Sequence, residues 1–204
     1  MAKQKSSFLS AWGTMYEIVK ALVDEVLSLG GNDESVRLIL TDKKIRHQIA
    51  KLLVDTSKVF GQIYSVVVDY GMSLFNMISV GNYDYVNSNI TAEHFPTTSE
   101  GVVKTKEVVL FHFNRDISSE VVIAEMNKAG YQPANIAELL ALGAQKPELQ
   151  LGFPIVGLGS VWRDPDGYRG SPVLRRDGSE RKLCLFYFGL AWYAYYRFAA
   201  VRKS

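Results

Sequence analysis

The chain has only one cysteine, Cys184, among its 204 residues. A single thiol cannot form an internal disulfide bond, and it cannot supply the several thiolates of a structural zinc site. The three histidines, His47, His94 and His112, are far apart in the sequence, and none has a second ligand at metal-binding spacing. We therefore expect neither a disulfide framework nor a bound metal.

The chain also lacks an excess of charge of either sign. It has 23 basic and 21 acidic residues, which gives a formal net charge of +2. Domains that bind nucleic acids usually carry a marked basic excess, so this balance gives no support for a nucleic-acid partner. Hydrophobic residues make up 48% of the chain, which is enough for a folded core and argues against extended disorder.

Long uncharged hydrophobic stretches are absent as well. The most apolar stretch near the start, residues 8–29, is interrupted by Glu17, Lys20, Asp24 and Glu25. A membrane-spanning helix needs about 20 residues nearly free of charge, and a secretory signal needs an uncharged hydrophobic centre. We therefore expect no membrane span and no signal peptide, with a cytoplasmic location as the default.

Motifs of the common enzyme classes are also missing. The chain has no Walker-type phosphate loop, no HExxH zinc motif and no GxSxG nucleophile motif. Residues 157–159 (GLG) lie in a predicted strand without the following helix that dinucleotide binding requires. Asp164 and Asp166 stand beside a glycine, where two carboxylates more often make a turn than a calcium site. We therefore predict that the protein is not an enzyme and has no cofactor.

The first 58 residues have the spacing of amphipathic helices. Apolar residues recur at helical intervals up to a stop at Gly30-Gly31, and Asn32 and Thr41 are positioned to cap a second and a third short helix. The basic residues of the third helix and its end are Lys43, Lys44, Arg46 and Lys51. We predict a helical segment over residues 1–58 that serves in packing, tethering or oligomerisation. DNA binding by a helix-turn-helix is the alternative.

From about residue 60 the pattern becomes that of mixed strands and helices. The predicted strands are residues 64–70, 83–90, 102–113, 153–162 and 197–202. The predicted helices lie within 71–80, from Ser118 to Gly130, and from Asn135 to Gly143. The third strand is apolar on both faces and is therefore expected in the centre of a sheet. Asn135 and Glu138 have capping-box spacing, and the fold class is α+β.

The last forty or so residues are rich in aromatic side chains, mixed with charged residues and glycine. The natural core candidates among them are Trp162, Phe188, Trp192 and Phe198. The run Tyr193-Ala194-Tyr195-Tyr196 cannot point all its rings inward on any regular element. Exposed tyrosines give a large, stiff contact area at small entropic cost, so we predict a ligand-binding surface there. The alternative is one edge of a core with incidental surface tyrosines.

Two motifs that enclose this tail resemble those of a known family. Residues 157–162 (GLGSVW) open the tail and residues 197–203 (RFAAVRK) close it. Together with residues 136–144 and 85–91, they resemble the variable proteins of diversity-generating retroelements, of the kind found in uncultivated small-genome archaea and bacteria. The resemblance covers residues 60–204. It implies a C-type lectin fold of the formylglycine-generating-enzyme type.

The resemblance also implies which positions vary. In this family a reverse transcriptase rewrites template adenines, so asparagine codons become codons that end in a pyrimidine and never encode Trp, Met, Lys, Glu or Gln. Asn is absent from Val161 onward, as heavy rewriting predicts. The implied variable, ligand-binding positions, all with permitted residue types, are Tyr168, Gly170, Arg175, Asp177, Cys184, Phe186, Gly189, Leu190, Tyr193, Tyr195 and Tyr196.

Residues that rewriting cannot produce are implied to be fixed in the template. They are Trp162, Glu180, Lys182 and Trp192. Trp162, Trp192 and Phe198 are expected to hold the scaffold, while loops and short strands of a variable region, about residues 163–196, face solvent. One departure from the family pattern is Tyr187, which stands where a fixed Trp is expected.

The implied protein has a C-type-lectin-like domain over residues 59–204 that displays a diversified surface to varied macromolecular targets, chiefly proteins. Enzymes of the same fold act through cysteines, and the lone Cys184 argues against that activity. Two alternatives stay open. One is an enzyme of the formylglycine-generating fold, and the other is a nucleic-acid-binding or assembly module in the N-terminal helices.

Overall fold

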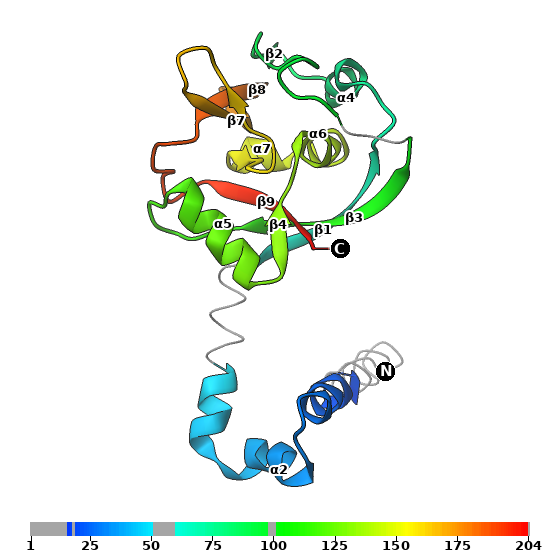
Figure 1. Cartoon of the computed structure of the whole chain (residues 1–204), viewed down its shortest axis with the longest axis vertical. Coiled ribbons are helices and arrows are strands. Elements are labelled where there is room, and N and C mark those ends of the chain that lie inside the picture. Colours follow the sequence, from blue (N-terminus) through cyan, green and yellow to red (C-terminus); the bar gives the residue numbers. More distant parts are fainter. Residues whose placement is uncertain (1–15, 18, 51–59, 98–100, 204) are drawn as a thin grey trace, which may run out of the picture. The chain divides into compact units, whose positions relative to one another are not determined.

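The computed structural model describes residues 16–17, 19–50, 60–97 and 101–203, which fall into two compact units, Met1–Asp55 and Thr56–Ser204 (Figure 1). Within these described ranges, no helix is both long enough and apolar enough to cross a membrane. The N-terminal unit is helical over residues 19–28 and 43–50 and over α2, Asp33–Thr41.

The start of α2 has the predicted cap, whereas the start of the third helix does not. The Asn32 side chain accepts a hydrogen bond from the Ser35 N–H (3.1 Å), and the Ser35 hydroxyl accepts one from the Asn32 N–H (3.2 Å). Thr41 is the last residue of α2, so its prediction as a cap is wrong. Asp42 takes that role, because its carboxylate accepts from the N–H groups of Lys44 and Ile45 (2.7 and 3.3 Å).

In the described part of the C-terminal unit, nine strands form one mixed sheet. The strands are β1 Phe60–Asp69, β2 Tyr85–Val86, β3 Val103–Phe111, β4 Tyr131–Pro133, β5 Ile155–Val156, β6 Trp162–Arg163, β7 Arg169–Asp177, β8 Glu180–Tyr187 and β9 Arg197–Arg202. The main path is β1-β3-β9-β5-β7-β8-β2, with β4 paired to β9 and β6 paired to β7. The β5–β9 and β2–β8 pairs are parallel and the other ladders are antiparallel.

The interior strands β3 and β9 bury side chains on both faces of the sheet. In β3, Val108 and Leu110 join one apolar cluster, and Val109 and Phe111 join the other. This alternation follows from the two-residue period of a strand. The prediction of a central strand is confirmed, since β3 lies between β1 and β9.

Helices cover both faces of the sheet (Figure 1). The helices α4, Leu74–Gly81, and α6, Ile136–Gln145, pack into the Val108 cluster, and α5, Ser119–Lys128, packs into the Phe111 cluster. A short helix, α7, spans Leu149–Gly152. The predicted helix start at Ser118 and the predicted cap Asn135 are confirmed, although α6 continues two residues past Gly143. The chain is thus a mixed α+β protein with a large sheet and several helices.

Two predicted strands are much shorter than expected. Residues 83–90 contribute only β2, and residues 153–162 contribute β5 and the first residue of β6. The chain leaves the sheet at Gly157-Leu158-Gly159, where the Gly159 N–H donates to the Ala134 carbonyl (3.0 Å). A Cβ on Gly159 would overlap the Pro133 carbonyl oxygen, so the backbones approach too closely for any larger residue.

The tail, expected as loops and short strands, contains a long antiparallel hairpin of β7 and β8. Its ladder runs from Gly170 opposite Tyr187 to Asp177 opposite Glu180. The two strands are joined by Gly178-Ser179, and Gly178 has the positive φ (59°) that such tight turns favour. This glycine-serine pair between extended segments is the signal that could have predicted the hairpin.

Arg181 fastens the hairpin to three helices. Its guanidinium donates to the carbonyls of Gly81 in α4 (2.6 Å) and Gly143 in α6 (2.7 Å), and to the Gln150 side-chain oxygen in α7 (3.0 Å). Charge-assisted hydrogen bonds of this kind are stronger than neutral ones. The hairpin is therefore held on a rigid support, although nothing in the sequence pattern marked Arg181 for this role.

Candidate ligand-binding surface

Three hollows lie along the hairpin and the segment that follows it, and Phe186 lines all three. They have volumes of about 430, 320 and 220 Å³. Tyr196 is shared by the first and second, and Tyr187 by the second and third. The hollows therefore adjoin one another, and we call them together the aromatic surface.

The first hollow combines cations with aromatic rings. Arg175 and Arg176 of β7 line it together with Phe186, Tyr195 and Tyr196. The Arg175 guanidinium lies 5.8 Å from the centroid of the Phe186 ring. Within the described residues, neither arginine is in ion-pair distance of a carboxylate. This end of the aromatic surface therefore suits a ligand that carries negative charge.

Tyrosine rings form pairs across the other parts of the surface. Tyr168 and Tyr187 meet edge to face with ring centroids 5.4 Å apart, at the open end of the hairpin. Tyr193 and Tyr195 stack at 5.9 Å. Tyr168, Tyr193 and Tyr195 are 58%, 60% and 55% exposed. Paired rings of this kind offer stiff apolar contact area with hydroxyl groups at the rim.

The segment that carries Tyr193 and Tyr195 is anchored through its backbone. The Ala194 N–H donates to the Asp116 carboxylate (3.0 Å), and the Ala194 carbonyl oxygen lies 2.9 Å from His112 Nε2. Two residues before Ala194, Trp192 exchanges two backbone hydrogen bonds with Ile117. The backbone is thus fixed while the two tyrosine side chains stay outside, and this arrangement separates the contact groups from the fold.

Buried residues beneath the surface supply its support. Trp192 and Phe198 are 4% and 1% exposed. The Trp192 indole N–H donates to the Ser119 hydroxyl (2.8 Å), which in turn donates to the Phe188 carbonyl oxygen (2.7 Å). This chain of hydrogen bonds satisfies the buried indole and ties the tail to the first residue of α5.

Eight of the eleven residues predicted at variable positions line the aromatic surface. They are Tyr168, Gly170, Arg175, Phe186, Leu190, Tyr193, Tyr195 and Tyr196. The hollows also include residues that were not predicted as contacts, chiefly Arg176, Tyr187, Asn87 and Asn89. The two asparagines come from the segment next to β2, which pairs with β8, and only this long-range pairing brings them close.

Three predicted positions lie away from the hollows. Asp177 is at the hairpin turn, where its ion pair with Lys182 (3.0 Å) lowers the pKa of its carboxyl group. Cys184 is buried, and this burial raises the pKa of its thiol. Gly189 lies against the Tyr187 ring, which any side chain at that position would have to displace.

Two expectations about exposure differ from the structure. Tyr196, expected on the outside, is only 7% exposed, because it precedes β9 and shares the inward face with Phe198 two residues later. Burial, with a contribution from Tyr195, raises the pKa of Tyr196 to about 12. Trp162, expected in the core, is half-buried on β6, where its ring stacks on His94 (4.4 Å) and lines the third hollow.

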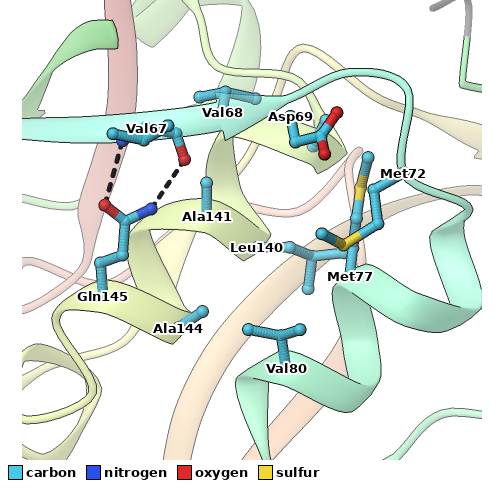
Figure 2. A pocket seen from close by; sticks show the side chains of 11 residues that line it. Val67, Val68, Asp69, Met72, Met77, Val80, Leu140, Ala141, Ala144 and Gln145 are labelled. Carbon is cyan, nitrogen blue, oxygen red and sulfur yellow. Dashed lines mark hydrogen bonds between the residues drawn. The ribbon is translucent and has the colours of Figure 1, made fainter. Parts of the chain in front are cut away.

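A separate apolar pocket of about 150 Å³ lies between β1, α4 and α6 (Figure 2). Its walls include Met72, Met77, Val80 and Leu140, and Asp69 is at its rim. The pocket holds no pair of groups suited to acid–base chemistry. In the described residues, no group of three or more His, Cys, Asp or Glu side chains is arranged to hold a metal ion.

Gln145 closes the edge of the sheet beside this pocket. Its side chain accepts from the Val67 N–H (3.0 Å) and donates to the Val67 carbonyl (2.7 Å), as Figure 2 shows. These two bonds occupy backbone groups of β1, which is an edge strand and would otherwise offer them to another chain.

Replacing Gln145 by alanine is expected to lower the free energy of unfolding by about 1–2 kcal/mol, because both bonds to Val67 are lost. Urea unfolding would measure the change. Gln145→Glu is the matched control, since a carboxylate can still accept from the Val67 N–H but sets an oxygen instead of a donor against the Val67 carbonyl, so it should also be less stable than the unchanged protein. Equal stability of all three would contradict the role of Gln145.

Comparisons of the chain with protein families, with curated proteins and with solved structures find no match. The aromatic surface and the sequence motifs are therefore the two indications of function.

Proposed function

We propose that the protein binds macromolecular ligands through the aromatic surface, and that this surface is diversified as in the variable proteins of diversity-generating retroelements. The observation that carries the proposal is that eight of eleven implied variable positions line three adjoining hollows. We extend the proposal to the fold, as a C-type-lectin-like domain over residues 59–204. The opening and closing motifs support this extension, since β9 is the closing motif and lies in the middle of the sheet.

The residues of types that rewriting cannot produce lie beneath the aromatic surface, beside it or at its margin. Trp192 lies buried beneath the surface. Glu180 and Lys182 form an ion pair (3.0 Å) near the hairpin turn, away from the hollows. Trp162 packs on His94 at the margin of the third hollow. A division between fixed support and changeable contact residues is what a diversified surface requires.

The contact positions also have room for other side chains. A Cβ on Gly170 would first meet Leu185 at 3.7 Å, which is an ordinary van der Waals contact. Tyr193 and Tyr195 project from an anchored backbone, so their replacement leaves the hydrogen bonds of Ala194 in place. Exposed aromatic rings with arginines at one end are typical of surfaces that bind proteins, and we propose proteins as the ligand class.

An enzyme of the same fold is the weaker candidate. Such chemistry needs a reactive thiolate, and the single thiol of Cys184 is buried with a raised pKa. Among the described residues, Cys184 lines none of the three hollows. We therefore propose a binding protein without catalytic activity.

A pair of matched libraries tests the binding function. In the first, the outward library, random codons that end in a pyrimidine are placed at seven positions that line the hollows, Tyr168, Gly170, Arg175, Phe186, Leu190, Tyr193 and Tyr195. We expect most members to fold, with a change in the free energy of unfolding of less than about 1 kcal/mol at the exposed positions and a larger one at Phe186, which packs partly against the core. Selection on a panel of immobilised folded proteins should then yield binders to several of them.

The control library randomises seven buried positions with the same codons. These are Val108, Leu110, Val156, Val173, Leu174, Leu183 and Phe198. Most of its members should fail to fold. Equal loss of folding in the two libraries, or an outward library without any binder, would refute the proposed function. The retroelement itself is tested in the surrounding DNA, where an adenine-rich near-copy of the final codons should lie beside a reverse-transcriptase gene.

A further inference from the structure

The N-terminal unit exposes apolar side chains without burying any of its described residues. From residue 16 to residue 50, with residue 18 not described, no side chain is buried. The most exposed large apolar side chains are Leu29 (79%) and Leu40 (77%), and Leu27 and Leu38 are also exposed. The described part of this unit has no buried core that could offset the conformational entropy that ordering its helices costs. It therefore requires a partner surface.

The charges of this unit are divided between its two halves. Among the described residues, the first half (16–34) carries five acidic residues, Glu17, Asp24, Glu25, Asp33 and Glu34, against the single base Lys20. The second half (35–50) carries four basic residues, Arg37, Lys43, Lys44 and Arg46, against the single acid Asp42. No salt bridge joins these groups to one another within the part of the chain that the structure describes.

We propose that the partner is a second copy of this chain, and that the N-terminal units of two copies form a two-fold symmetric dimer. In such a dimer every contact occurs twice, so the acidic half of each copy lies against the basic half of the other. The exposed leucines then become buried between the two units, where they leave water. This inference is independent of the ligand-binding function of the C-terminal unit.

The charge division excludes simpler arrangements. A parallel dimer would place acidic half on acidic half and basic half on basic half, and like charges at an interface are costly. A partner of one sign of charge, such as a nucleic acid, would complement the second half and repel the first. Only a partner with the reverse order of charges complements both, and an antiparallel copy of the same unit has that order.

The experiment uses the full chain and two charge-reversal variants. In the first variant Glu17, Asp24 and Glu25 become Lys, and in the second Arg37, Lys43 and Lys44 become Glu. Arg46 is left unchanged, because its guanidinium donates to the carbonyls of Ile39 and Leu40 at the end of α2. Molar mass is measured by light scattering after size-exclusion chromatography over a range of micromolar concentrations.

The unchanged chain is expected at about twice its mass of 22.8 kDa. Each variant alone should be monomeric, with a dissociation constant raised by at least about tenfold, because both symmetric contacts become repulsive. An equimolar mixture of the two variants should form a heterodimer, since both described halves of one unit then carry net positive charge and both described halves of the other carry net negative charge. This rescue separates interface repulsion from damage that the substitutions do to each unit by themselves, because a unit that its own substitutions prevented from folding would not pair in the mixture either.

A matched control places three charge reversals on exposed residues of the C-terminal unit, Lys104→Glu, Arg115→Glu and Lys203→Glu. It should stay dimeric. A monomeric unchanged chain would overturn the proposal, and so would a mixture of the two variants that stays monomeric. Raised salt should weaken the dimer of the unchanged chain through screening, and a dimer that is insensitive to both salt and charge reversal would also contradict the proposed arrangement.

Discussion

Replacing Trp192 by alanine is expected to lower the free energy of unfolding by about 3–5 kcal/mol, as for other buried aromatic residues. The side chain is 4% exposed and packs against Tyr196 and Phe198 at centroid distances of 5.3 and 6.0 Å. The substitution would also leave the buried Ser119 hydroxyl without the hydrogen bond that it accepts from the indole N–H. Urea unfolding followed by circular dichroism at fixed protein concentration measures the loss.

The neighbouring tyrosines provide the matched controls for Trp192. Tyr193→Ser and Tyr195→Ser are expected to change the free energy of unfolding by less than about 1 kcal/mol, since both rings are more than half exposed. Tyr196→Ser should instead cost about 2–4 kcal/mol, because its ring is buried with Trp192. A similar loss for all four substitutions would show that the tail has no separation between support and contact residues.

Replacing Gly159 by alanine is expected to destabilise the protein by about 3 kcal/mol or more. The added methyl group would overlap the backbone of Pro133 and Ala134, which cannot move without disturbing the start of α6. It would also strain the hydrogen bond from the Gly159 N–H to the Ala134 carbonyl (3.0 Å). Thermal and urea unfolding would both report this effect.

Gly170→Ala is the control for the Gly159 substitution. Both changes add one methyl group, but at Gly170 the new Cβ meets only the Leu185 side chain at 3.7 Å or beyond. A change of less than about 1 kcal/mol is expected there. If the two substitutions had equal effects, close backbone approach would not explain why the chain carries glycine at position 159.

The elements that the sequence predicted well have local signals. The capping box of Asn135 and Glu138 starts α6, because the two side chains satisfy each other's backbone N–H groups within one turn. The central place of β3 followed from apolar residues on both of its faces. Patterns of this kind depend on neighbours in the chain or on burial alone, so a single sequence is sufficient to recognise them.

The sequence pattern does not predict the hairpin of β7 and β8, because the burial of the side chains changes along both strands. Val173 and Leu174 are adjacent and both buried, since they face opposite sides of the sheet, so the two-residue alternation disappears in the middle. The ends near Asp177 and Glu180 are exposed on both sides. Only pairing with distant segments, such as β5 with β7, defines these environments.

For the tail, the sequence predicted which residues line the aromatic surface better than it predicted how exposed each residue is. Eight of the eleven implied positions line the aromatic surface, yet Tyr196 is buried and Trp162 is not. Residue type alone cannot decide these cases. Tyr196 is oriented by the strand that begins one residue later, and Trp162 lies on the two-residue strand β6, which pairs with β7.

Because Phe186 borders all three hollows, the positions around it cannot be optimised one at a time. A residue smaller than Phe186 at this position would join the first hollow, which Arg175 lines, to the second and third hollows, which Leu190 and Tyr168 line. A larger residue would separate the three hollows further. Under the proposed binding function, the benefit of a given side chain at those positions would depend on which residue occupies position 186, so their effects on affinity would be epistatic. If the surface is diversified as proposed, each residue at position 186 would favour a different set of residues at the remaining positions.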